Sequence, residues 1–139
     1  MNYREGDPEA AILAAAPDGV DLVVEVAPAQ NNELDVAVTK VHGTIAIYAN
    51  NGGNELSIQL RETFSKNLRY QFLILYTLDD RFLRAAVDDI GEALRAGGLG
   101  VGEEVGVPLH HYPLDQTAAA HDAVENGAVG KVLLDIADD

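Results

Sequence analysis

Two short β-branched runs separated by a helical segment constrain the fold more than any other feature of this sequence. "VDLVVEV" at 20–26 and "TIAIYA" at 44–49 have the length and composition of buried strands. Between them, "NNELDVAVTKVHG" offers Asn31 or Asn32 as a helix N-cap and Gly43 as a helix end. Because strand, helix and strand alternate, the sequence predicts an α/β fold with a parallel sheet and crossover helices.

The segments on either side continue this alternation. Asp7 and Pro8 are a typical N-cap and first helical residue, so we expect a helix over residues 8–16 that Pro17 ends. Aromatic and β-branched residues in "LRYQFLILY" predict a further strand over 68–76. The first half of the chain therefore contributes two predicted helices and three predicted strands.

The clearest helical pattern follows in "DDRFLRAAVDDIGEALRAGG". Asp80 and Arg84 form a favourable i,i+4 pair, and Gly97 ends the predicted helix. Its apolar stripe consists of Phe82, Ala86, Val87, Ile90 and Leu94. Beyond it, "VPLHHYPL" is expected to be extended, Asp115 to cap a helix over 116–126, and "KVLLDI" to form the last strand.

The charge balance and the lack of cysteine limit the classes of partner. The chain carries 23 acidic and 9 basic residues and a net charge of −14. Such a surface repels nucleic acid and anionic membranes, so neither is an expected partner. The sequence has no cysteine, no apolar stretch of the ~18 residues that a membrane span needs, and no apolar segment after Met1. We therefore expect a cytoplasmic protein.

Two motifs that could indicate chemistry are better explained by structure. His110 and His111 are adjacent in an extended segment, so they point to opposite faces and cannot chelate one ion. "GGLGVG" at 97–102 follows a helix rather than a strand and does not fit the dinucleotide-binding pattern, so we interpret it as a linker. The sequence predicts no metal site and no catalytic acid, base or nucleophile.

One candidate site lies where the predicted strands end. Ligands of open parallel sheets bind beyond the carboxyl ends of the strands. Tyr48, Asn50 and Asn51 follow the strand at 44–49, and Asn31 follows the preceding strand. These residues are either the walls of one crevice or parts of ordinary surface loops.

Several segments, in order, resemble one known family. They are "NYREGD", "GVDLVVEV", "TIAIYAN", "FSKNLRYQFLILY" and "YPLDQTAAAHDAVENGAVGKVLL". Over Asn2 to Ile136 the chain resembles the carboxy-terminal part of the medium-chain dehydrogenase/reductases, in the zinc-independent quinone oxidoreductase branch that is zeta-crystallin-like. The resemblance implies one partial, doubly wound Rossmann domain over residues 1–139. It also implies that the first strands, the glycine-rich turn and the catalytic GroES-like domain of such enzymes are absent from these residues.

The resemblance further implies which residues contact NADPH. Tyr3 would lie by the adenosine phosphate and Asn31 by the ribose. The nicotinamide side would be lined by Tyr48, Ala49, Asn50 and Asn51, and backbone groups for the carboxamide would come from Leu73, Ile74 and Leu75. The chain departs from the family at Ala49, where a glycine is usual, and its "NNGGNE" loop is two residues longer.

The family reaction is hydride transfer from NADPH to a quinone or an activated alkene, with the cofactor carrying the chemistry and no metal required. The resemblance implies that this chain alone is inactive. A free-standing nucleotide-binding module and a structural or interaction domain are the alternatives. Without its central neighbour, the strand at 20–26 becomes an apolar edge, so we predict homo-oligomers through exposed sheet edges. The electron acceptor and the choice of NADPH over NADH stay open.

Overall fold

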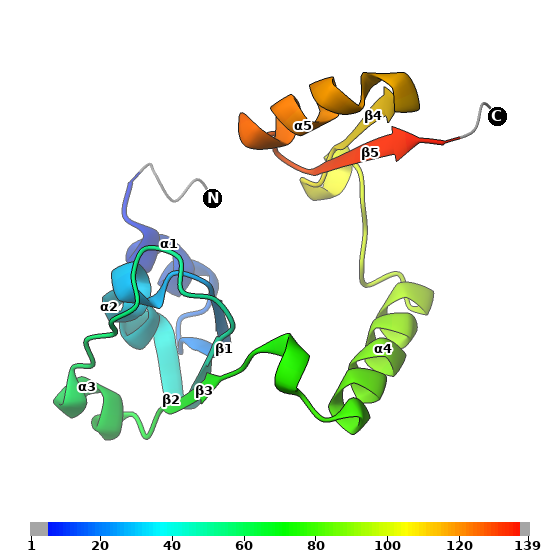
Figure 1. Ribbon diagram of the computed structural model, residues 1–139. Helices are drawn as coiled ribbons and strands as arrows, with labels where there is room; N and C mark the ends of the chain where they lie inside the picture. The colour runs from blue at the N-terminus through cyan, green and yellow to red at the C-terminus, as the bar shows by residue number, and fades with distance from the viewer. Residues whose placement is uncertain (1–5, 137–139) are drawn as a thin grey trace. The chain divides into compact units, whose positions relative to one another are not determined.

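A computed structural model describes residues 6–136 of the chain, which fall into two units that divide between Asp79 and Asp80. Each unit contains its own parallel sheet with at least one helix connecting neighbouring strands (Figure 1). The predicted α/β class is therefore confirmed, and the architecture is that of a partial Rossmann-like domain.

The first unit is built on a three-stranded sheet in the order β1-β2-β3. Its strands are β1 (Val20–Glu25), β2 (Thr39–Ile47) and β3 (Arg69–Phe72), and both pairs are parallel. The helices of this unit are α1 (Pro8–Ala15), α2 (Pro28–Val38) and α3 (Leu60–Ser65). Helix α2 packs against β1 and β2, and α1 packs against α2 (Figure 1).

The core of this unit lies between α2 and the middle strand. Val36 of α2 and Ile45 and Ile47 of β2 are buried together. Val23, Leu56, Leu68 and Tyr70 pack against them as partly buried side chains. The apolar runs at 20–26 and 44–49 that predicted strands thus supply the inner face of the sheet.

The predicted boundaries of helix α2 are wrong. The helix begins at Pro28 rather than after Asn31 or Asn32, because the fixed φ of proline suits the first helical position. It ends at Val38, and Thr39 is already extended with its hydroxyl donating to the Asp35 carbonyl at 2.6 Å. Pairing with β1 begins at once, since Val20 lies opposite Thr39.

Gly43 is consequently inside β2 and not at the end of a helix. Val20 pairs with Thr39 but Leu22 pairs with Thr44, so β2 bulges between these two positions. His42 has a φ of 66° in the bulge. A Cβ on Gly43 would overlap the Thr39 side chain, so close packing explains the glycine.

The predicted strand at 68–76 is strand only over Arg69–Phe72. Leu73 N–H still donates to the Ile47 carbonyl at 3.0 Å, and a 3₁₀ turn, η1, follows at Leu75–Thr77. Strand β2 ends at Ile47, so residues after Leu73 have no neighbouring strand to pair with. The aromatic and β-branched composition predicted the strand correctly but not its length.

The second unit contains helix α4 and a two-stranded parallel sheet. Helix α4 spans Asp80–Arg95, with the predicted Asp80 to Arg84 ion pair at 3.9 Å. Strands β4 (Leu109–Pro113) and β5 (Lys131–Asp135) are joined by α5 (Thr117–Glu125), which packs against both strands. Short 3₁₀ turns stand at η2 (Glu103–Val105) and η3 (Leu114–Gln116).

Of two predictions for this unit, the cap of the last helix is wrong and the apolar stripe of α4 is confirmed. Asp115 does not cap the last helix, because it lies within η3 and α5 has no side-chain cap. Instead, Thr117 turns its hydroxyl back to the Leu114 carbonyl at 2.6 Å. The residues of the predicted apolar stripe all lie on helix α4. Its four large side chains are 53–68% exposed: Phe82, Val87, Ile90 and Leu94.

Candidate cofactor site

The ends of β1 and β2 are joined by backbone hydrogen bonds. Tyr48 N–H donates to the Glu25 carbonyl at 3.3 Å, and Asn51 N–H donates to the Val26 carbonyl at 2.8 Å. The loops after the two strands therefore lie against each other, as expected for parallel strands that end at the same edge of a sheet.

A pocket of about 530 Å³ opens at this edge, within the first unit. Five of the residues predicted to contact a cofactor line it: Tyr48, Ala49, Asn50, Leu73 and Ile74. Most of the remaining wall is apolar, with contributions from Ile47, Leu56, Phe72 and Leu78. An apolar pocket of this size with a few polar groups is typical of small-molecule and cofactor sites.

The other predicted residues lie outside the pocket lining. The Asn51 N–H bonds to the Val26 carbonyl and so joins the loops after β1 and β2, and Asn31 directs its side chain to Glu25. Leu75 begins the η1 turn and is 57% exposed, and Tyr3 lies outside the described residues. Contact of these residues with a cofactor stays a prediction.

The loop that carries Asn50 is closed by its own hydrogen bonds. The Asn50 side-chain amide donates to Oδ1 of Asn54, and Gly53 N–H donates to the Asn50 carbonyl at 3.2 Å. Gly52 has a φ of 84°, a conformation that favours glycine. Ala49 is not among the described residues with positive φ, so its side chain costs no backbone strain there.

Sequence reasoning missed two buried carboxyl groups beside this edge. Glu25, at the end of β1, and Asp35, on α2, are 5% and 4% exposed. Burial, the negative charge of Glu25 and a hydrogen bond with Glu25, in that order, raise the pKa of Asp35 from its ordinary 3.8 to about 7. The one sequence signal was Glu25 itself, which with Asp21 is one of two charged residues in the otherwise apolar run at 20–26.

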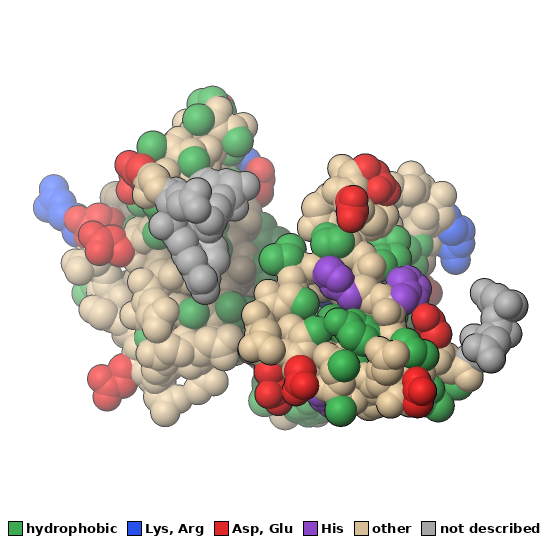
Figure 2. Space-filling model, turned by 90° about the horizontal axis from the view of Figure 1, so that it is seen from above, with side chains coloured by type: hydrophobic (Ala, Val, Ile, Leu, Met, Phe, Trp, Pro, Cys, Tyr) green, Lys and Arg blue, Asp and Glu red, His purple; other side chains and the backbone are tan. Residues whose placement is uncertain are grey.

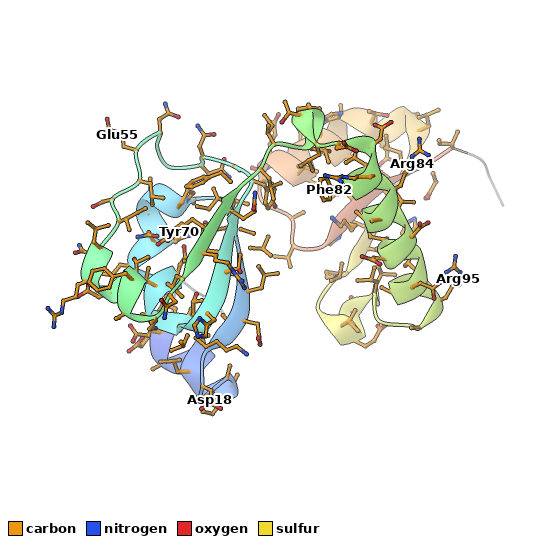
Figure 3. All side chains as sticks on the ribbon, turned by 90° about the horizontal axis from the view of Figure 1, so that it is seen from below. Asp18, Glu55, Tyr70, Phe82, Arg84 and Arg95 are labelled. Atoms are coloured by element: carbon orange, nitrogen blue, oxygen red, sulfur yellow. The ribbon has the colours of Figure 1, made fainter. Side chains whose placement is uncertain are left out.

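A partly buried network ties β3 to α2. The Tyr70 hydroxyl donates to Oδ1 of Asn32 at 2.7 Å, and the Asn32 amide donates to the Ser57 carbonyl at 2.9 Å. Figure 3 shows Tyr70 reaching from the sheet toward the helix. Burial raises the pKa of the Tyr70 hydroxyl above its ordinary value. Asn32, proposed from the sequence as a cap, instead anchors the chain that follows the pocket loop.

The two adjacent histidines of β4 have separate partners. His110 Nε2 is hydrogen-bonded to the Val129 carbonyl at 2.8 Å, and His111 Nδ1 to the Asp135 carboxylate at 2.9 Å. Between residues 6 and 136, no three His, Asp or Glu side chains are grouped so that they could hold a metal ion.

Acidic side chains outnumber basic ones in this chain, 23 to 9. Figure 2 shows acidic side chains dispersed over the visible face of the chain, with few basic ones among them. In the described part of the chain, no helix is both long enough and apolar enough to cross a membrane.

Parallel strands with crossover helices, and a pocket beyond the ends of β2 and β3, define an α/β domain of the Rossmann-like class. The chain belongs to the zinc-binding dehydrogenase family, whose model matches residues 1–134. The family implies a nicotinamide cofactor. The zinc of the family name has no matching ligand set among the described residues.

Solved structures with this fold include dehydrogenases and a reductase. Benzyl alcohol dehydrogenase from Acinetobacter calcoaceticus matches 96% of this chain at 15% identity, with a TM-score of 0.68 and 36% of its own length covered. An alcohol dehydrogenase from a Thermus species matches 96% of this chain at 19% identity, with a TM-score of 0.69, and 37% of its own length is covered. A quinone oxidoreductase from Pseudomonas syringae matches 96% of this chain at 16% identity, with a TM-score of 0.65, and 41% of its own length is covered.

These matches show the fold, and the chain spans well under half of each of these proteins. No curated protein sequence matches the chain.

Proposed function

We propose that this chain forms the carboxy-terminal part of the cofactor domain of an NADPH-dependent enzyme of the quinone oxidoreductase type. The observation that carries the proposal is the pocket beyond β2 and β3. It gathers three residues that the sequence resemblance assigned to the nicotinamide side and two that it assigned to the carboxamide. The same pocket lies where an open parallel sheet binds its ligands.

The pocket residues would orient the nicotinamide and exclude water. Bound NADPH supplies the hydride for a quinone or an activated alkene. Ile47, Leu56 and Phe72 provide apolar walls. Leu73 N–H is already bonded to the Ile47 carbonyl, so the Leu73 carbonyl and the Ile74 N–H are the groups that would meet the carboxamide.

Catalytic turnover is expected of a longer protein that contains these residues. The chain spans 36–41% of the solved dehydrogenases and reductases compared above. No described pocket residue is assigned as a catalytic acid, base or nucleophile. We therefore expect cofactor binding without measurable quinone reduction by this chain alone.

A structural or interaction domain is the second candidate function, and the edge strand β1 favours it. Strand β1 stands at the end of the sheet order, and Leu22 and Val24 are 54% and 64% exposed. An exposed apolar edge can pair with another strand. The partner proposed for the β1 edge is a second copy of the chain.

Calorimetric titration with NADPH, with NADH in parallel, tests the proposed function. Saturable binding that weakens in Tyr48→Ala supports it. Phe64→Ala is the matched control, because Phe64 is an exposed aromatic of α3, in the same unit and outside the pocket lining. Absence of binding at millimolar NADPH, from a sample that is folded by circular dichroism, refutes a cofactor site formed by this chain alone and leaves a scaffold part of a longer enzyme or the interaction domain.

A further inference from the structure

We infer that Glu25 and Asp35 act as a pair of positioning residues that fix Asn31, and the turn between β1 and α2, at the edge of the cofactor pocket. The inference rests on the proposed function, because Asn31 is the residue expected beside the cofactor ribose. It adds a role for two carboxyl groups that do not line the pocket themselves.

Glu25 organises the turn through its carboxylate. Its Oε1 accepts hydrogen bonds from Val26 N–H at 2.7 Å and from Ala27 N–H. The Asn31 side-chain amide donates to both carboxylate oxygens, at 3.2 and 3.3 Å. One buried carboxylate therefore holds the first residues after β1 and the side chain of Asn31 together.

The same residue also connects this turn to the pocket. The Glu25 backbone carbonyl accepts from Tyr48 N–H, and Tyr48 lines the pocket. Pro28 directly follows Ala27, whose N–H donates to Glu25, and is another lining residue. A displacement of the Glu25 carboxylate would therefore move the pocket wall as well as Asn31.

Asp35 controls where the Glu25 carboxylate can lie. Asp35 is 4% exposed, its carboxyl interacts electrostatically with that of Glu25, and its buried Oδ2 has no hydrogen-bond partner within the described chain. A proton held on Asp35 can be donated to Glu25, which otherwise accepts every hydrogen bond that its side chain makes. Without that proton, two negative charges would meet in a buried site.

The titratable and charged groups near the pair make their hydrogen bonds to other partners. Tyr70 of β3 faces Asp35 with a hydroxyl that is bonded to Asn32. The Lys66 ammonium, before β3, donates to the carbonyls of Val36, Ala37 and Thr39 at 2.7, 2.9 and 2.9 Å. The pKa of Asp35, raised to about 7 chiefly by burial, agrees with a proton shared inside the pair near neutral pH.

Loss of this proton is expected to release Asn31. Repulsion between the two carboxylates would move the Glu25 side chain and weaken its bonds to Asn31 and to the turn. Cofactor affinity would then fall as the pH rises through neutrality, by roughly fivefold or more. Asp35→Asn keeps a donor toward Glu25 and cannot ionise, so this variant should bind equally at pH values on either side of neutrality.

The test follows the side-chain amide signals of Asn31 by nitrogen-proton NMR in the full chain between about pH 5.5 and pH 8.5, a range centred on the Asp35 transition. Signals that shift with a midpoint near 7 in the unmodified chain and stay constant in Asp35→Asn support the inference. Asp88→Asn, an exposed aspartate of α4, is the matched control and should titrate like the unmodified chain. Signals that do not titrate in the unmodified chain overturn the inference.

Parallel titrations with NADPH at the two ends of this pH range separate the inference from the proposed function. An affinity that is pH-dependent in the unmodified chain and in Asp88→Asn, but not in Asp35→Asn, supports both. Titrating Asn31 signals without NADPH binding in any variant support the positioning pair and refute a cofactor site formed by this chain alone. An affinity with the same pH dependence in all three proteins overturns the inference. The NMR titration of the unmodified chain needs no variant, so it can still overturn the inference if Asp35→Asn does not fold.

Discussion

Replacing Asp35 by asparagine should stabilise the first unit at neutral and alkaline pH and leave its stability unchanged in acid. In the folded chain the pKa of Asp35 is raised from 3.8 to about 7. Below pH 3.8 the carboxyl is protonated in both the folded and the unfolded chain. Between these values only the unfolded chain ionises, so the free energy of unfolding falls as the pH rises, and it levels off above about 7.

The size of the effect follows from the shift in pKa. Each pKa unit corresponds to about 1.36 kcal/mol, so the penalty on the folded state above neutrality is about 4 kcal/mol at most. Asparagine avoids this penalty because it is neutral, and its amide can still donate to Glu25. Asp35 is 4% exposed, so screening by solvent does not cancel the effect.

Urea denaturation followed by far-ultraviolet circular dichroism, at several pH values between about 4 and 8, measures this difference. The Asp35→Asn chain should match the unmodified chain in acid and exceed it by up to about 4 kcal/mol above neutrality. Asp88→Asn removes the same charge from the exposed face of α4 and corrects for repulsion within a chain of net charge −14. Parallel stability curves for Asp35→Asn and the unmodified chain would refute the reasoning.

Two further predictions concern the edge of the sheet and the tie between β3 and α2. Charged substitutions at Leu22 and Val24 should abolish self-association through the β1 edge, and sedimentation of the unmodified chain as a monomer at high concentration would contradict that proposal. Tyr70→Phe should lower the free energy of unfolding by about 1–3 kcal/mol, because Oδ1 of Asn32 loses its donor. Thermal denaturation checks this loss, and an unchanged midpoint would show that the bond contributes nothing net.

The Rossmann-like architecture was predictable because its signals are local. The apolar runs at 20–26 and 44–49 give strands through their own composition, and the helix between them makes a parallel pair the simplest connection. Asp7 caps α1 as predicted, since its side chain accepts from Ala10 N–H three residues on. The placement of Tyr48 and Asn50 at the pocket followed from the same topology, because parallel strands end at one edge.

Helix and strand limits were predicted less well, because neighbours decide them. Asn31 and Asn32 have the composition of caps, but one is drawn to Glu25 and the other to Tyr70. Gly43 has the composition of a helix stop, but pairing of β2 with β1 extends the strand through it. The strand at 68–76 stops at Phe72 because β2 offers no partner beyond that point.

The amino-acid sequence by itself thus determined the fold class, the order of the strands along the chain and the edge of the sheet where a ligand would bind. Only the tertiary structure brought Glu25 and Asp35 together beneath that edge. Their interaction depends on how deeply a strand end and a helix face are buried against each other. Burial of that kind changes the energy of a charge, and it leaves no regular spacing in the sequence from which it could be read.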